Sequence, residues 1–401
     1  MRYILKDRNL LLLFIVSFLF FLNETILLPV LPMVLHSLDY SNTEIGMTLG
    51  AFALGVVIFR PLTAYVTDNK SRKLSLLIGT AVFLIAPFLY FVSMDFTYLL
   101  CVRFFHGLGL SFFTTASPAF VSDCAPENHR AEILGHMGVA SSLASVGGPM
   151  LGVLIYNAWG IHQVLWGCIA LGLLGIVLTV CIREKRLPDE RKPEARAYIN
   201  TLRNRCVMVA SGLVLVLAVM YGGIFTFLPV LVKDQFSVNV GLIFMINSLS
   251  LVIIRLLTSH FSDRYGRGPV AFYSFLILCL SYYLIGRAGT TWELIGAGIL
   301  NGIGAGGCLP ALIAHVVDNT DARIRGIAFS IFYGAFDIGV LMGSAALGVL
   351  ADMTSLRDMY ILTAMFGLIA LGGFALSIQA GPVRSLKWTL AGKKFNFNNK
   401  N

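Results

Sequence analysis

Charged residues are scarce in this sequence. Asp, Glu, Lys and Arg make up 13% of the 401 residues, hydrophobic residues make up 57%, and the mean hydropathy is +0.80. Soluble domains carry roughly 25% charged residues, so the composition excludes an ordinary soluble protein. The sequence also lacks a GxxxxGK[ST] nucleotide loop, an HExxH pair and a nucleophile elbow. We therefore expect no enzyme, no cofactor and no ATP-driven process, which leaves an ion gradient as the source of energy.

The seven cysteines are odd in number, are never spaced as CxxC, and lie mostly within apolar runs. This pattern is typical of small apolar residues, so the sequence predicts neither a disulfide framework nor a metal site.

Long apolar runs dominate what is present. A bilayer core of about 30 Å needs roughly 20 apolar residues per helix, whereas membrane strands would give short alternating segments. The sequence therefore predicts an all-α polytopic membrane protein with twelve transmembrane helices, at about 10–34, 44–67, 74–93, 97–122, 132–156, 162–182, 206–232, 238–261, 269–287, 291–317, 326–350 and 358–380.

The net charge of +9 follows from an uneven distribution of Lys and Arg. With both termini in the cytoplasm, most basic residues fall in cytoplasmic segments; Lys233, Arg287 and Arg357 fall outside, and three arginines lie within spans. This positive-inside bias predicts a multi-pass protein of the cytoplasmic (inner) membrane. We expect no nucleic-acid partner and a chain that works as a monomer with a small-molecule substrate and protons.

The chain contains an internal repeat. RPLTAYVTD at 60–68 recurs as RLLTSHFSD at 255–263, and the same offset relates several further pairs: Arg72 and Arg267, Gly107 and Gly302, Gly109 and Gly304, Asp123 and Asp318, Arg130 and Arg325, and Gly148 and Gly343. LPV at 28–30 recurs at 228–230 with a slightly larger offset. The pattern predicts a six-helix bundle at 1–182, a cytoplasmic linker at 183–205, and a second bundle with a short tail at 206–401.

This organisation resembles the major facilitator superfamily, whose two six-helix halves run parallel and hold the substrate near the bilayer midplane. DNKSRK at 68–73 and DRYGRG at 263–268 are similar to its DRxGRR-type loop, and RFFHGLGLSFFTTASP at 103–118 is similar to its RxxxGxG motif. GHMGVASSLASVGGPMLG at 135–152 resembles the glycine-proline motif of the twelve-span drug:proton antiporter branch. The sequence departs from these motifs at five positions: Ala64, Asn69, Ser71, Ala144 and Val153.

The resemblance implies a charged gate at the cytoplasmic ends of the spans. Asp68 would meet the start of span eleven near Gly326, because a helix amino terminus favours a carboxylate, and Arg72 would reach Asp123 as Arg267 reaches Asp318. The alternative is a set of solvated charges that only sets the topology. The expected gate residues are Arg60, Asp68, Arg72, Asp123, Arg130, Arg255, Asp263, Arg267, Asp318 and Arg325. Arg60 and Arg255 are assigned to the gate and not to the substrate site. Each lies about 12 Å before a helix-ending aspartate, which is close enough for its side chain to reach the cytoplasmic face.

Ionisable residues within the spans are the expected proton-coupling site, because each is costly in hydrocarbon unless it faces water or a partner. Glu24 lies too deep in span one to reach the cytoplasm, and a carboxylate held away from water binds a proton more readily. Asp337 in span eleven is the second candidate, and Arg103 in span four would orient an acidic group or an anionic substrate. The alternatives are a structural, hydrogen-bonded Glu24 and a packing Arg103.

Further residues are assigned to the cavity and to helix packing. Phe20, Asn23, Tyr221 and Phe225 are candidate cavity-lining residues, whereas His106 and His315 are expected to be packed and neutral. In the glycine-rich segments, Gly107, Gly148, Pro149 and Gly152 would allow close packing or bending.

Together these features predict a secondary transporter that exports a small organic compound in exchange for protons. GAFALGVVIFRPL at 50–62 is similar to segments of sugar-efflux, multidrug and metallophore exporters. Two alternatives stay open: a proton symporter that imports a sugar or organic acid, and a transporter-like sensor or assembly factor that transports nothing.

Overall fold

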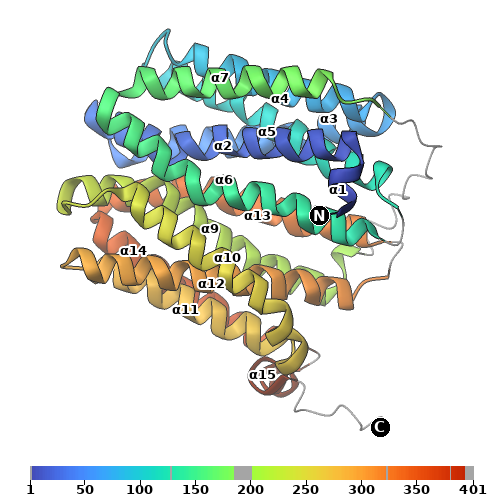
Figure 1. Ribbon diagram of the computed structural model, residues 1–401. Coiled ribbons are helices and arrows are strands. Elements are labelled where there is room, and N and C mark those ends of the chain that lie inside the picture. The colour runs from blue at the N-terminus through green and yellow to red at the C-terminus, as the bar shows by residue number, and fades with distance from the viewer. Residues whose placement is uncertain (1, 127–128, 185–200, 322–323, 380, 393–401) are drawn as a thin grey trace. The chain divides into compact units, whose positions relative to one another are not determined.

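The computed structural model describes residues 2–126, 129–184, 201–321, 324–379 and 381–392. All regular secondary structure in these ranges is helical (Figure 1). Most of the predicted linker at 183–205 lies outside the described residues.

Twelve helices in the described part of the chain are long and apolar enough to cross a membrane, which confirms the predicted all-α membrane fold. In chain order they are α2 (Arg8–Ser37), α3 (Asn42–Asn69), α4 (Arg72–Leu89), α5 (Phe96–Cys124), α6 (Arg130–Trp159), α7 (Ile161–Val180), α9 (Arg205–Gln235), α10 (Val240–Tyr265), α11 (Arg267–Arg287), α12 (Thr291–Asp318), α13 (Arg325–Met353) and α14 (Leu356–Ser377). Two shorter helices, α1 (Arg2–Lys6) and α15 (Pro382–Ala391), flank this set.

Polar residues in the short joints begin several of these helices. Ser41 accepts a hydrogen bond from the backbone N–H of Glu44, whose side chain accepts one from the Ser41 N–H, and this capping box starts α3. Thr290 and Glu293 form the same arrangement at the start of α12. Each box pairs N–H groups that the helix itself leaves without partners, so the joints fix where the spans begin.

The chain packs as two compact units. Unit 1 comprises 1–190, 225–245 and 344–349, and unit 2 comprises 191–224, 246–343 and 350–401. Parts of α9, α10 and α13 therefore group with the first six spans, whereas the repeat predicts a division at the linker. The boundaries of the two sequence repeats and of the two compact units are thus different.

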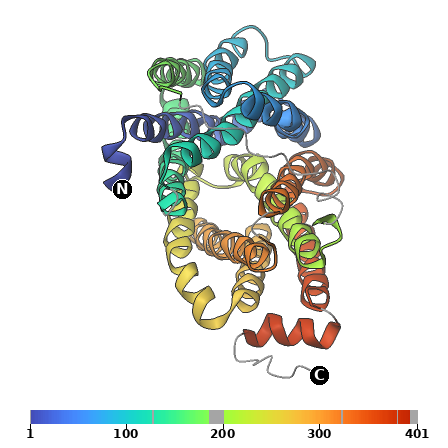
Figure 2. The same ribbon diagram turned by 90° about the vertical axis from the view of Figure 1, so that its right-hand side faces the viewer.

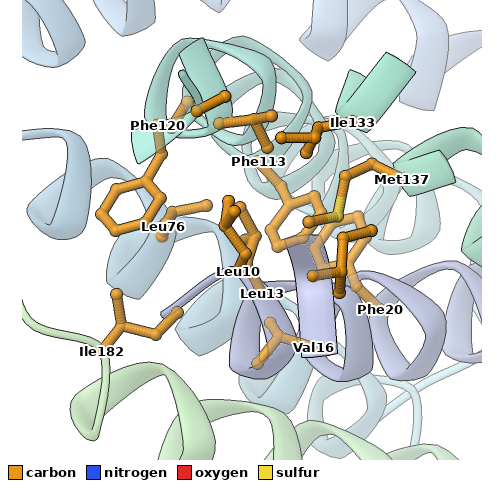
Figure 3. Packing of buried hydrophobic residues seen from close by; sticks show 14 of the residues in the cluster. Leu10, Leu13, Val16, Phe20, Leu76, Phe113, Phe120, Ile133, Met137 and Ile182 are labelled. Atoms are coloured by element: carbon orange, nitrogen blue, oxygen red, sulfur yellow. The ribbon is translucent and has the colours of Figure 1, made fainter. Parts of the chain in front are cut away.

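Unit 1 has a hydrophobic core where α2, α4, α5 and α6 meet (Figure 3). Leu13 and Val16 of α2 face Leu76 of α4 and Phe113 of α5 in this cluster, and all four side chains are fully buried or nearly so. These helices use apolar side chains on the inside as well as on the lipid side, which explains why hydropathy alone does not separate the two faces.

Glycines bring helix backbones into direct contact. A Cβ atom on Gly107 of α5 would collide with the carbonyl oxygen of Phe52 in α3, and one on Gly302 of α12 would collide with that of Asn247 in α10. Gly107 and Gly302 are equivalent positions of the repeat. Because lipid gives no hydrophobic drive for helix association, such small residues let the helices gain close packing.

The glycine-proline segment of α6 packs against the span that carries Glu24. A Cβ on Gly148 would collide with the Thr25 side chain, and one on Gly152 would collide with the Ile26 carbonyl oxygen. The Thr25 hydroxyl also donates a hydrogen bond of 3.1 Å to the Ala144 carbonyl oxygen of α6. Gly148 and Gly152 are therefore packing residues of the α2–α6 contact, and Pro149 lies between them inside α6.

Helix α15 crosses the ends of α11 and α14. Figure 1 shows it end-on beside spans that run across the page, and Figure 2 shows it along its length. Ser385 and Thr389 are buried against unit 2, whereas Val383, Leu386 and Leu390 are exposed. Exposed apolar residues on a short amphipathic helix are typical of a membrane interface. The ten-residue segment is too short for the hydropathy signal that predicts a span.

The glycine contacts generate a stability prediction. Gly107→Ala inserts a methyl group against the backbone of α3, so we expect it to destabilise the protein by about 1–3 kcal/mol, the usual cost of overpacking. Gly135→Ala is the matched control, because a Cβ at Gly135 meets nothing within 4 Å and alanine favours helix. Melting temperatures in detergent measure both; equal values for the two variants would contradict the packing role of Gly107.

Candidate functional site

Glu24 lies on α2 and its side chain is partly buried. The carboxylate is within electrostatic range of the guanidinium of Arg103 on α5. Sequence separation gives no hint of this proximity; it arises because α2 and α5 share the core of unit 1. The structure thus places two of the three predicted proton-coupling residues within electrostatic range of each other.

Arg103 is a buried cation with only part of its hydrogen-bonding capacity used. Its side chain is 4% exposed, and its guanidinium carbon lies 4.3 Å from the centre of the Phe52 ring. Its guanidinium also interacts with the Tyr90 hydroxyl, while its Nε has no hydrogen-bond partner among the described residues. An aromatic face and a hydroxyl partly replace water around the charge, and the nearby Glu24 carboxylate supplies the opposite charge.

His106 lies one turn after Arg103 on α5 and is 1% exposed. Its Nδ1 is 3.4 Å from the Tyr90 hydroxyl, and its ring packs edge-on against Phe83 with centres 4.3 Å apart. Its Nε2 has no hydrogen-bond partner in the described chain. We call Glu24, Phe52, Tyr90, Arg103 and His106 the Arg103 cluster. Phe52 and Tyr90 were not identified from the sequence, because no local pattern distinguishes them from the many other aromatic residues.

Two residues predicted to line the cavity are part of the packed interior instead. The Phe20 ring is 4% exposed and stacks on Phe113 with ring centres 3.9 Å apart (Figure 3). Asn23 is 1% exposed, and its Nδ2 donates to the carbonyl oxygens of Cys168 (2.8 Å) and Phe83 (3.3 Å). Phe20 therefore fills the core, and Asn23 ties α2 to α4 and α7.

The other two cavity candidates lie one turn apart on α9. In unit 2, the Tyr221 ring lies 5.8 Å from that of Phe336. In unit 1, the Phe225 ring stacks on that of Phe244, with centres 5.0 Å apart. The side chains of Tyr221 and Phe225 are both partly exposed, so part of each ring is accessible from outside its unit's packed interior.

Arg60 and Arg255, the repeated pair, have different surroundings. Arg60 on α3 is partly buried, and Arg255 on α10 is exposed and lies within electrostatic range of Tyr221 and Tyr333. Asp337, the third proton-coupling candidate, is partly buried on α13, one turn after Tyr333.

The ends of α3, α4 and α5 hold a group of ion pairs. Arg72 Nη1 is 2.5 Å from Asp68 Oδ1, and Arg72 Nε is 3.2 Å from Asp123 Oδ2. In the second repeat, Arg267 Nε is 3.0 Å from Asp318 Oδ2. Both arginine–aspartate pairs expected from the motif are therefore present.

The remaining gate candidates are not in the ion pairs described above, or their side chains lie outside the described residues. Arg130 is partly buried at the start of α6 and its Nε has no hydrogen-bond partner among the described residues. Arg325 is exposed at the start of α13. Asp263 belongs to α10, but its side chain lies outside the described residues.

Another ion pair of unit 1 was not foreseen. His36 Nε2 near the end of α2 is 2.7 Å from Asp234 Oδ1 near the end of α9, and the neighbouring Lys233 donates a hydrogen bond of 3.2 Å to the Met33 carbonyl oxygen. No sequence motif marks these residues. Across the described ranges, no group of three or more His, Cys, Asp or Glu side chains is placed to hold a metal ion.

The repeated ion pairs differ in exposure, and this difference is testable. Asp123 is 16% exposed, whereas Asp318 is 50% exposed. Solvent weakens exposed pairs, so we expect a coupling of about 1 kcal/mol between Arg72 and Asp123 and a few tenths between Arg267 and Asp318. Double-mutant cycles with Arg→Gln and Asp→Asn, followed by unfolding in detergent micelles, measure both. Equal couplings would show that burial does not set their strength.

Sequence comparison places these features in a known family. The model of the Major Facilitator Superfamily matches residues 13–257 and 214–394. An uncharacterized MFS-type transporter of Methanocaldococcus jannaschii is 23% identical over 374 residues, covering 90% of this chain and 96% of that one. The staphylopine export protein of Staphylococcus aureus is 23% identical over 377 residues, covering 89% and 93%. The quinolone resistance protein NorA of the same species is 26% identical over 166 residues, covering 41% and 42%.

Solved structures share the fold. The crystal structure of the nucleoside transporter NupG aligns with a TM-score of 0.79 at 15% identity, covering 92% of this chain and 99% of that one. A bacterial homolog of the human lysosomal transporter Spinster aligns with a TM-score of 0.74 at 15% identity, covering 90% and 94%. With its family match over nearly the whole chain and its twelve membrane helices, the protein is a multi-pass membrane transporter that belongs to the Major Facilitator Superfamily.

Proposed function

We propose that this transporter exports a small organic compound across the cytoplasmic membrane in exchange for protons. The observation that carries the proposal is the placement of the Glu24 carboxylate near the buried Arg103 guanidinium, inside spans of one bundle. Ionisable residues in spans are costly and are retained for ion or substrate pathways. The names of two relatives, an export protein and a resistance protein, support the outward direction.

Proton binding at Glu24 changes the charge balance of the Arg103 cluster. With Glu24 ionised, its negative charge offsets the positive charge of Arg103. When the carboxylate takes a proton, Arg103 must rely on the Phe52 ring and the Tyr90 hydroxyl. Arrival and departure of the proton therefore favour two different arrangements of α2 and α5, which is what coupling to a conformational cycle requires.

The close packing of α6 on α2 extends this coupling. Gly148 and Gly152 leave no room between α6 and the turn of α2 that immediately follows Glu24. A shift of that turn therefore moves α6 as well, because packed backbones transmit displacement. The drug:proton antiporter branch suggested by the α6 motif fits this use of the segment.

The ion pairs at the ends of the spans are proposed to act as a gate. Arg72 joins the end of α3 to the end of α5 through Asp68 and Asp123, and Arg267 joins the start of α11 to the end of α12. In the proposed topology these ends are cytoplasmic, as are both termini. Asp337 serves as a second proton site in this scheme.

Removal of the Glu24 charge tests proton coupling. In proteoliposomes with an imposed proton gradient, we expect Glu24→Gln to reduce transport of a quinolone or of staphylopine to the level of empty liposomes, because a glutamine cannot load and release a proton. Binding-induced proton release should disappear together with transport. Glu44→Gln is the matched control, since glutamine preserves the capping box at the start of α3. Unchanged transport and proton release in Glu24→Gln would contradict the proposal.

The direction of transport is tested in cells. Deletion of the gene should raise the cellular content of the exported compound and lower its content in the medium, as measured by untargeted metabolite profiling of both. The opposite change would indicate uptake, and no change in any compound would indicate a protein that does not transport.

A further inference from the structure

Arg255 is a cation exposed on a membrane-spanning segment, which calls for an explanation. It lies on α10 within electrostatic range of two hydroxyl groups, those of Tyr221 on α9 and Tyr333 on α13. We call these three residues the Arg255 cluster, and all of them belong to unit 2. An arginine facing lipid within a span is strongly unfavourable. An exposed arginine at this position therefore needs water or a polar solute beside it.

Two of the three helices, α9 and α13, are held together by direct backbone contact. Cβ atoms on Gly339 and Gly343 of α13 would collide with the carbonyl oxygens of Leu215 and Val219 of α9. The Tyr221 ring on α9 also lies 5.8 Å from the ring of Phe336 on α13. The two tyrosines are thus carried by a rigid pair of helices, while Tyr333 keeps 41% of its surface exposed.

The chemistry of the Arg255 cluster favours a negatively charged ligand. A guanidinium has five N–H donors and no acceptor, and a tyrosine hydroxyl adds one O–H donor. These donors and the positive charge suit the oxygens of a carboxylate or phosphate, which form the strongest charge-assisted hydrogen bonds. A neutral or cationic group would leave the arginine charge without compensation.

The internal repeat places residues without a hydroxyl group at the positions equivalent to the two tyrosines. The offset that relates Arg60 to Arg255 also relates Gly138 to Tyr333, and the offset of the LPV repeat relates Phe21 to Tyr221. Neither Gly138 nor Phe21 has a side-chain hydroxyl. The arginine is therefore common to both halves, whereas tyrosines stand at these two positions only in the second half.

We propose that Tyr221, Arg255 and Tyr333 bind the anionic group of the transported compound, a carboxylate or phosphate, in the second half of the transporter. This proposal rests on the transport function proposed above. It replaces the sequence-based assignment of Arg255 to the gate, and it leaves Arg60 in that assignment.

Binding to the purified full-length protein tests the proposal without any proton gradient. The probes are phthalate for the carboxylate arm, phenyl phosphate for the phosphate arm, and dimethyl phthalate as the uncharged match. We expect at least one anionic probe to bind, dimethyl phthalate not to bind, and Arg255→Gln to weaken the anion at least tenfold, since a charged hydrogen-bonding group is lost. Tyr333→Phe, which removes a single hydroxyl, should weaken it severalfold. Binding of phthalate would identify a carboxylate as the ligand group, and binding of phenyl phosphate would identify a phosphate.

Arg287→Gln is the matched control, because it removes an exposed arginine at the end of α11 that belongs to unit 2 but neither to the gate nor to the Arg255 cluster. It should bind the anion as the unaltered protein does. Equal weakening in Arg287→Gln and Arg255→Gln, no weakening in Arg255→Gln or Tyr333→Phe, or no binding of either anion would overturn the proposal. If Arg255→Gln does not fold, Tyr333→Phe decides alone.

The same variants separate this proposal from that of proton-coupled export. Glu24→Gln should still bind the anion and still reject dimethyl phthalate, because Glu24 is not part of the Arg255 cluster. Loss of anion binding at the Arg255 cluster with intact proton-coupled transport of an uncharged compound would refute the anion site only. Anion binding at this cluster in a protein that transports no compound when a proton gradient is imposed would refute the export function only.

Discussion

Direct contact between helix backbones is the constraint on which the rest of this structure depends. Lipid offers no hydrophobic drive for helix association, so the spans must gain their stability from close packing. Gly107 on the Phe52 carbonyl of α3, and Gly148 and Gly152 on the turn after Glu24, supply this contact in unit 1. The same glycines fix which polar side chains face each other, because the helices can approach only where no side chain intervenes.

The Arg103 cluster is a consequence of that packing. Once α3 and α5 cross at Gly107, Phe52 is placed over Arg103, which lies one turn earlier on α5. The arginine charge is then removed from lipid and meets an aromatic face, a hydroxyl and the Glu24 carboxylate. Small residues thus act in two ways: they stabilise the fold, and they bring polar side chains together inside the bundle.

Hydropathy predicted the twelve spans well, because a span is a local property of about 20 residues. The resemblance to the family's loop motif implied the Arg72–Asp123 pair, and the structure contains it. The surroundings of Arg103 could not be predicted from the sequence, because Phe52 and Tyr90 come from other helices and one sequence does not reveal helix neighbours. Phe20 was misplaced for the same reason, since an aromatic residue in a span can face the core, the cavity or lipid.

Duplication explains how one scaffold can carry two different polar sites. Gly107 and Gly302 make equivalent backbone contacts, so both halves keep the same helix crossing. Side chains that do not take part in these contacts are free to diverge. In the first half, the Glu24 carboxylate is within electrostatic range of a buried arginine, whereas in the second half tyrosines at the positions equivalent to Phe21 and Gly138 are within electrostatic range of Arg255. The packing constraint thus preserves the helix crossings, and the proposed proton site and the proposed anion site use side chains that lie outside these crossings.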